Sequence, residues 1–230
     1  MNHDDTFVVR LEGVVGAGKS SLLEYLKKKY KGARDEIDFV PEPVKEWMNF
    51  YGHDLLTEYY DGRISPAVFQ IHALMELVFL HQKRPKKKLR IIERSVAAGR
   101  YIFLELQKEE NLISECEYLI IKNIYQEILK SDLGKNLRTD VTFYIRTDPR
   151  IAFDRMMRRG RKAEANVSLS YLQKLQKKYD EWLIQKIYPE SQPIVRIINS
   201  NASLSIWTLS LKKVVMSSDD ETKYLCNYEY

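Results

Sequence analysis

The sequence has few cysteines and no long apolar run. Cys116 and Cys226 are its only two cysteines, and their separation matches neither a metal-binding spacing nor a disulfide framework. No apolar run approaches the ~20 residues that a membrane-spanning helix needs. Residues 1–6 are acidic, whereas a targeting peptide would be basic. We therefore expect a cytoplasmic protein that does not bind a membrane.

The excess of positive charge is also small. A formal net charge of +5 among 230 residues does not by itself indicate nucleic-acid binding. The basic stretch at residues 81–90 (HQKRPKKKLR) resembles a nuclear-localisation or nucleic-acid patch. Because it leads directly into a candidate buried strand, a solvated loop is favoured, and we expect no nucleic-acid partner.

Short β-branched runs alternate with helical patterns along the chain. The predicted strands are residues 7–11, 37–40, 89–92, 141–145 and 194–198. The predicted helices are residues 20–30, 66–82 and 172–183, with two more between the third and fourth strands. This alternation predicts an α/β fold in which helices flank a five-stranded parallel sheet in three layers. We expect one domain over residues 1–216 and a mobile tail over residues 217–230.

A glycine-rich loop joins the first predicted strand to the first helix. Its sequence, GVVGAGKS from Gly13 to Ser20, fits the P-loop pattern G-x-x-x-x-G-K-[ST]. Backbone N–H groups and the helix N-terminus would hold phosphate oxygens, Lys19 would bridge the terminal phosphates, and Ser20 would ligate Mg²⁺. The predicted ATP-binding residues of this loop are Gly13, Val14, Val15, Gly16, Ala17, Gly18, Lys19, Ser20 and Ser21. The motif predicts ATP or GTP binding but not the reaction.

Carboxylates follow two of the other predicted strands. Glu42 lies between two prolines after the second strand, at the sheet edge where ligands of open α/β folds bind. There it could accept the proton of an attacking hydroxyl. The third strand ends in Glu93 and Arg94, which could hold Mg²⁺ and orient Glu42 respectively.

A dense basic segment follows the fourth predicted strand. Arg155, Arg158, Arg159 and Arg161 surround Gly160, and such a cluster repels itself unless an anion is present. An arginine-rich lid that closes over ATP would stabilise the transferring phosphoryl group and exclude water. We predict that Arg155, Arg159 and Arg161 contact ATP.

In order along the chain, these motifs resemble the deoxynucleoside kinase family. The resemblance implies a P-loop NTPase-type fold and transfer of the ATP γ-phosphate to the 5′-hydroxyl of a deoxyribonucleoside in nucleotide salvage. It implies catalytic roles for Glu42, Arg94 and Lys19, and a homodimer formed through helices near residues 66–82 and 113–130. The implied substrate-binding residues are Glu42, Trp47, Leu56, Tyr59, Tyr60, Gln70, Ala73, Leu77, Arg94, Gly99, Phe103 and Glu164.

Within that resemblance, two positions bear on the choice of base. Members that favour purines or cytidine carry an arginine and an aspartate where this chain has Leu77 and Gly99. A pocket without those charges should tolerate the 5-methyl group of thymine, which favours a pyrimidine, thymidine or deoxycytidine. The absence of a side chain at Gly99 could equally admit a larger base.

Two other functions share part of this pattern. A nucleoside monophosphate kinase of the thymidylate kinase type has the same loop and lid, but it must bind an acceptor phosphate, whereas the surroundings of Glu42 suit a neutral hydroxyl. A nucleotide-dependent switch that acts on a protein partner is the second alternative. Its guanine-reading N-K-x-D motif is absent from the sequence.

Overall fold

Five parallel strands form the centre of the computed structural model, which describes residues 6–30, 37–83, 87–191 and 193–199. They are β1 (Phe7–Glu12), β2 (Ile37–Val40), β3 (Leu89–Glu93), β4 (Val141–Arg146) and β5 (Val195–Asn199). Their order across the sheet is β2-β3-β1-β4-β5, and every neighbouring pair is parallel. The predicted α/β fold is therefore confirmed. The tail predicted at residues 217–230 lies outside the described residues.

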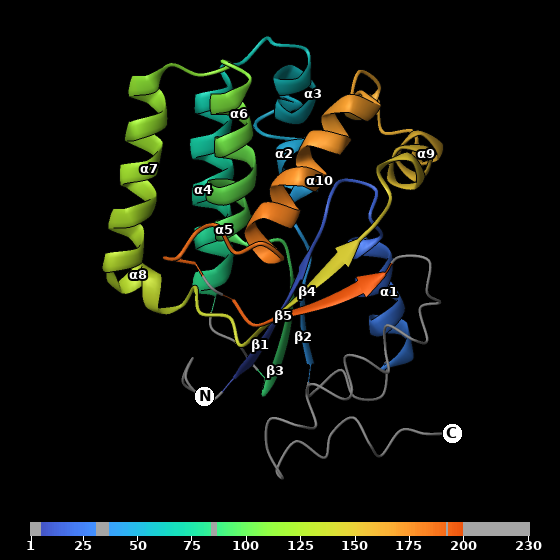
Figure 1. Ribbon diagram of the computed structural model, residues 1–230. Coiled ribbons are helices and arrows are strands. Elements are labelled where there is room, and N and C mark those ends of the chain that lie inside the picture. The colour runs from blue at the N-terminus through green and yellow to red at the C-terminus, as the bar shows by residue number, and fades with distance from the viewer. Residues whose placement is uncertain (1–5, 31–36, 84–86, 192, 200–230) are drawn as a thin grey trace.

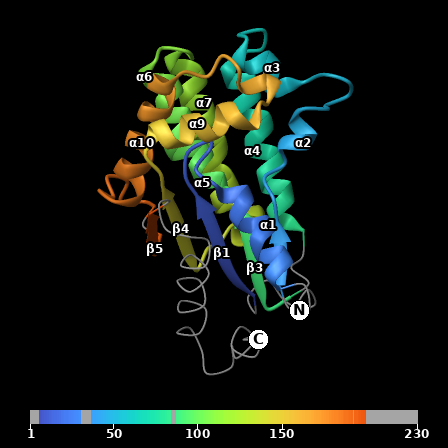
Figure 2. The same ribbon diagram turned by 90° about the vertical axis from the view of Figure 1, so that its right-hand side faces the viewer.

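Helices cover both faces of this sheet. Figures 1 and 2 show α4 and α7 on one side of the strands and α1 on the other. The α-helices are α1 (Lys19–Lys29), α2 (Val44–Trp47), α3 (Leu55–Tyr60), α4 (Pro66–Gln82), α5 (Val96–Ala98), α6 (Glu105–Glu109), α7 (Glu115–Lys130), α8 (Asp132–Lys135), α9 (Pro149–Arg159) and α10 (Leu169–Leu183). A π-helical turn, Gly99–Leu104, joins α5 to α6, and a 3₁₀ turn, Lys162–Glu164, precedes α10. No helix among the described residues is long and apolar enough to cross a membrane.

Most predicted elements occur within one residue of their expected limits. The last strand begins at Val195 rather than at residue 194. Between β3 and β4 the chain forms more helices than the two predicted. The short helix α8 follows α7 because the Ser131 hydroxyl accepts a hydrogen bond from the Leu133 N–H at 3.2 Å and starts a new turn.

The core explains why apolar residues predominate in β1 and β4. Val9 and Leu11 of β1, and Phe143 and Ile145 of β4, are fully buried because helices pack on both faces. Burying each such side chain contributes about 1.5–3 kcal/mol. This burial holds the carboxyl ends of the strands together at one edge, from which the functional loops emerge.

The phosphate-binding loop connects β1 to α1 at that edge. Gly16 has φ of +79°, in the left-handed region, and a Cβ at this position would lie 2.1 Å from the carbonyl oxygen of Ala152 in α9. Only glycine satisfies both the backbone conformation and the close approach. The loop is therefore packed closely against the first turns of α9, the helix that carries Arg155 and Arg159.

Candidate active site

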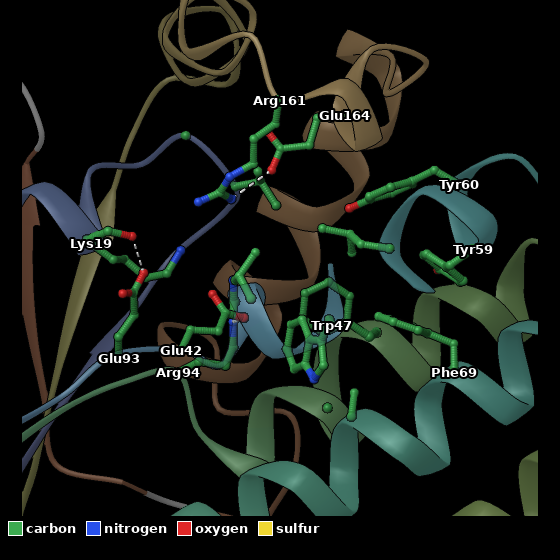
Figure 3. A pocket seen from close by; sticks show the side chains of 18 of the residues that line it. Lys19, Glu42, Trp47, Tyr59, Tyr60, Phe69, Glu93, Arg94, Arg161 and Glu164 are labelled. Atoms are coloured by element: carbon green, nitrogen blue, oxygen red, sulfur yellow. Dashed lines mark hydrogen bonds and ion pairs between the residues drawn. The ribbon is translucent and has the colours of Figure 1, made fainter. Parts of the chain in front are cut away.

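A cavity of about 670 Å³ lies at the carboxyl edge of the sheet. Figure 3 shows Lys19 and Glu93 on one side of this cavity, aromatic side chains on the other, and Glu42 and Arg94 between them. Every substrate-binding residue predicted from the sequence lines this cavity. The lining also includes predicted ATP- or metal-binding residues: Val15, Gly16, Gly18, Lys19, Ser20, Ser21, Glu93, Arg155, Arg159 and Arg161. Gly13, Val14 and Ala17, which were predicted to bind ATP, belong to the same loop but do not line the cavity.

Lys19 is anchored by its own loop. Its Nζ donates to the carbonyl oxygens of Gly13 at 3.0 Å and Val14 at 3.1 Å, and the residue is 5% exposed. Burial and, to a smaller extent, the nearby charge of Arg94 together lower the pKa of Lys19 to about 8, although the charge of Glu42 acts in the opposite direction. A polyphosphate placed here would restore the favourable surroundings of the ammonium group.

Two oxygen groups lie close together beside Lys19. The Ser20 hydroxyl donates to Glu93 Oε1 at 2.6 Å, joining the start of α1 to the end of β3. Hydroxyl and carboxylate oxygens are ligands that suit a hard divalent cation. The described residues contain no cluster of three or more histidine, cysteine, aspartate or glutamate side chains able to hold a metal.

Glu42 and Arg94 form a buried ion pair at the centre of the cavity (Figure 3). Arg94 Nε donates to Glu42 Oε1 at 2.8 Å, and the two side chains are 4% and 13% exposed. Burial alone would raise the pKa of Glu42, but the charges of Arg94 and Lys19 and the hydrogen bond from Arg94 hold it below its ordinary value. Glu42 is therefore an ionised carboxylate, the form that can accept a proton.

The lid arginines pair with one carboxylate. Arg159 Nη2 lies 2.5 Å from Glu164 Oε2, and Arg161 Nη1 lies 3.1 Å from Glu164 Oε1. Arg155 Nη1 donates to the Ala17 carbonyl at 3.4 Å and so bridges α9 to the phosphate-binding loop. The lid arginines therefore line the same cavity as Lys19, while Glu164 remains buried.

Aromatic rings form the far wall of the cavity. Tyr59 stacks on Phe69 with ring centroids 4.5 Å apart, and Trp47 meets Phe69 edge-on at 5.8 Å. Phe103 also lines the cavity, and the Arg94 guanidinium lies 5.2 Å from its ring centroid. Flat walls of this kind accommodate a planar aromatic ligand.

The polar end of this aromatic slot is set by Gln70. Its Nε2 donates to the Gly99 carbonyl at 2.9 Å, and the amide nitrogen carries a second hydrogen for another acceptor. Gly99 begins the π-helical turn, and a Cβ there would lie 3.0 Å from Gln70 Nε2. Turns of this type are frequent at functional sites, and this one brings Gly99 against Gln70.

The cavity lining also includes residues that were not predicted to bind a substrate: Val44, Phe69, Leu74, Gln107, Tyr171 and Arg158, the last of which belongs to the predicted lid. Phe69 precedes Gln70 in α4, so its adjacency was a signal that could have found it. Gln107 donates from Nε2 to the Tyr59 hydroxyl at 3.2 Å, across a long separation in the chain that no local pattern reveals. Tyr171 lies in the first turn of α10, outside every motif that predicted a contact with a ligand.

Comparison with known proteins places this site in a family. The family model for deoxynucleoside kinase matches residues 9–223. Mitochondrial thymidine kinase 2 of Homo sapiens is 28% identical over 192 residues, which cover 83% of this chain and 69% of that protein. Deoxycytidine kinase 2 of Gallus gallus is 30% identical over 201 residues, which cover 77% of this chain and 74% of the relative. The chain therefore belongs to the deoxynucleoside kinase family, whose members transfer a phosphoryl group from ATP to a deoxynucleoside.

Proposed function

We propose that this kinase phosphorylates the 5′-hydroxyl of a pyrimidine deoxyribonucleoside, thymidine or deoxycytidine, with Glu42 as the general base. The observation that carries the proposal is the pairing of Glu42 with Arg94 at 2.8 Å in the cavity shared by the phosphate-binding loop and the aromatic side chains. Glu42 would take the proton of the 5′-hydroxyl as its oxygen attacks the γ-phosphorus. The bond from that phosphorus to the bridging oxygen of ADP would break in the same transfer.

The two ends of the cavity would hold the two substrates. Lys19 and the lid arginines would stabilise the charge on the ATP phosphates, because guanidinium and ammonium groups in a closed site interact strongly with phosphoryl oxygens. Glu164 and Tyr60 would bind the 3′-hydroxyl of the sugar. The buried position of Tyr60 raises the pKa of its phenol, so the group would remain a neutral hydrogen-bond donor.

The lining of the base slot supports a pyrimidine. Ala73, Leu77 and Gly99 contribute no charge to the cavity, and Gln70 supplies an amide that can read the donor and acceptor groups of a base edge. The relatives named above are a thymidine kinase and a deoxycytidine kinase, which agrees with this preference. Trp47 and Phe103 would lie against the two faces of the base.

We further propose that Ser20 and Glu93 hold a Mg²⁺ ion. Their oxygens, 2.6 Å apart, suit this cation, and the remaining ligands would come from ATP and water because protein sites for Mg²⁺ seldom supply all of them. When bound, the ion would supply charge neutralisation at the phosphates. The chain itself contributes these two oxygens, which it holds close together beside Lys19.

We also propose that the protein forms a homodimer and is located in the cytoplasm. Large apolar side chains are half exposed on two helices, at Val68 and Phe79 of α4 and at Leu119 and Ile120 of α7, as expected for a surface that another subunit covers. Analytical ultracentrifugation of the wild type and of Leu119→Asp would test the dimer. Imaging of the tagged chain would test its location, since one relative is named mitochondrial.

The test of the proposed activity uses four deoxynucleosides. Purified protein would be incubated with ATP, Mg²⁺ and thymidine, deoxycytidine, deoxyadenosine or deoxyguanosine, and the 5′-monophosphate would be measured. We expect turnover of a pyrimidine that collapses in Glu42→Gln while ATP binding survives. Turnover of thymidine monophosphate in place of every nucleoside would overturn the proposal, and a preference for purines would overturn its choice of base.

A further inference from the structure

A buried tyrosine lies behind the proposed catalytic pair. Tyr179, in α10, is fully buried, and its hydroxyl accepts a hydrogen bond from Arg94 Nη1. The same hydroxyl donates to Glu12 Oε2 at 3.2 Å. Tyr179 is absent from the cavity lining. Its hydroxyl therefore connects Arg94 to a buried carboxylate of β1.

Arg94 has an unusual backbone conformation, and its side chain makes several contacts behind Glu42. It follows β3 with φ of +71°, a region that non-glycine residues seldom occupy. Its Nη1 also donates to the Gly13 carbonyl at 3.3 Å and lies 3.9 Å from Glu12 Oε2. The guanidinium is thus held from behind, and this leaves Nε facing Glu42 at 2.8 Å.

We propose that the Tyr179 hydroxyl is a positioning group that fixes Arg94, and through it the carboxylate of Glu42, for phosphoryl transfer. This inference rests on the proposed function, because it assigns a role in the reaction that Glu42 would perform. The hydroxyl has one acceptor and one donor partner, so no other orientation of its proton satisfies both Arg94 and Glu12. Burial raises the pKa of Tyr179 well above its ordinary value, and the proton needed for the bond to Glu12 is retained.

Removing this hydroxyl should loosen the pair in front of it. Without an acceptor at Tyr179, Nη1 of Arg94 is free to approach the Glu12 carboxylate, and the bond from Nε to Glu42 lengthens. That bond is one of the interactions that keep Glu42 ionised. Other charged or titratable groups also interact electrostatically with Glu42. They are Lys19 of α1, Tyr60 of α3, Tyr179 of α10 and Arg161 of the lid. Apart from Tyr179, these side chains are not altered by the substitution, so the longer bond from Arg94 should raise the pKa of Glu42.

The experiment is the pH dependence of kcat/KM for Tyr179→Phe, with the best nucleoside as substrate. We expect kcat to fall about 2- to 12-fold, the equivalent of one hydrogen bond. The acid limb of the profile should move to higher pH, while KM for ATP stays within about twofold of the wild-type value because no phosphate contact is lost. A merely structural role would lower the amount of active protein without moving the limb.

Tyr144→Phe is the matched control. The ring of Tyr144 stacks on Tyr179 with centroids 5.7 Å apart, and its hydroxyl donates to Asp180 Oδ1 at 2.8 Å, away from Arg94. We expect this variant to keep the wild-type pH profile. An unchanged profile and kcat in Tyr179→Phe, or the same change in both variants, would overturn the inference.

A second variant covers the case in which Tyr179→Phe does not fold. Glu12→Gln keeps the size of the side chain and leaves the Tyr179 hydroxyl in place to accept from Arg94 Nη1, but it removes the carboxylate toward which Arg94 would otherwise move. If Tyr179 holds Arg94, the acid limb of this variant should not move to higher pH. A limb that moves to higher pH would show that Glu12 rather than Tyr179 holds Arg94, and it would overturn the inference. Failure of the proposed function is distinguishable, because then the wild type itself would not phosphorylate a nucleoside or Glu42→Gln would remain active.

Discussion

Replacing Glu164 by glutamine should separate the binding of the two substrates. In the free protein Glu164 pairs with Arg159 at 2.5 Å and with Arg161 at 3.1 Å, while the carboxylate itself is 4% exposed. Glutamine keeps the shape but loses the charge. It therefore releases two arginines proposed to act on ATP and weakens an acceptor proposed to act on the sugar hydroxyl.

The expected magnitudes follow from these contacts. A hydrogen bond to a charged group contributes about 1.5–3 kcal/mol, so KM for the nucleoside should rise roughly 10- to 150-fold. The arginine side chains are 33% and 29% exposed, and solvent screening reduces each ion pair to about 1 kcal/mol or less. Freeing the arginines should thus leave KM for ATP unchanged or lower it by a few-fold at most.

Steady-state kinetics with each substrate varied in turn would measure both constants. Glu110→Gln is a matched control, because Glu110 pairs with Lys174 at 2.6 Å on the exposed surface and should change neither constant. A rise in KM for ATP as large as the rise for the nucleoside would refute the reasoning. Glu164 would then act by holding the lid in place for ATP rather than by binding the sugar.

Three further results are expected at the phosphate end of the cavity. Gly16→Ala should abolish ATP binding measured by calorimetry, because its Cβ would meet the Ala152 carbonyl oxygen at 2.1 Å with φ of +79°. ATP affinity should weaken as pH rises through about 8, where Lys19 of the nucleotide-free protein loses its proton. An ATP affinity that does not change up to pH 9.5 would contradict that pKa. Glu93→Gln should raise the Mg²⁺ concentration needed for half-maximal activity about 10-fold or more, and an unchanged Mg²⁺ titration would exclude Glu93 from the metal site.

Local patterns predicted the fold and much of the site for physical reasons. The P-loop depends on glycines, a lysine and a helix start that lie close together in the chain. Apolar residues predominate in β1 and β3 because both faces of these strands are covered. Glu42 and Arg94 follow strands of a parallel sheet, whose carboxyl ends necessarily share one edge. Sequence spacing therefore sufficed for these groups.

The remaining features depend on contacts between distant segments. The Tyr179 hydroxyl contacts Arg94 and Glu12 only because α10 packs over the strand ends. The sequence predicted only that Tyr179 lies in a helix over residues 172–183. The π-helical turn at Gly99 has no distinctive composition. Gln107 of α6 lines the cavity because the preceding π-helical turn rotates α6 relative to the position it would have in an uninterrupted α-helix.

The central place of β1 has a consequence for how the chain folds during synthesis. This strand leaves the ribosome first, yet both of its neighbours, β3 and β4, come much later in the sequence. Its apolar residues must therefore wait for partners, a delay that exposes nascent chains to aggregation. Gly13 in the phosphate-binding loop packs against the carbonyl oxygen of Ile145 at the end of β4. The loop is complete only after β4 joins the sheet, and nucleotide binding by a nascent chain would report that late event rather than the emergence of the loop itself.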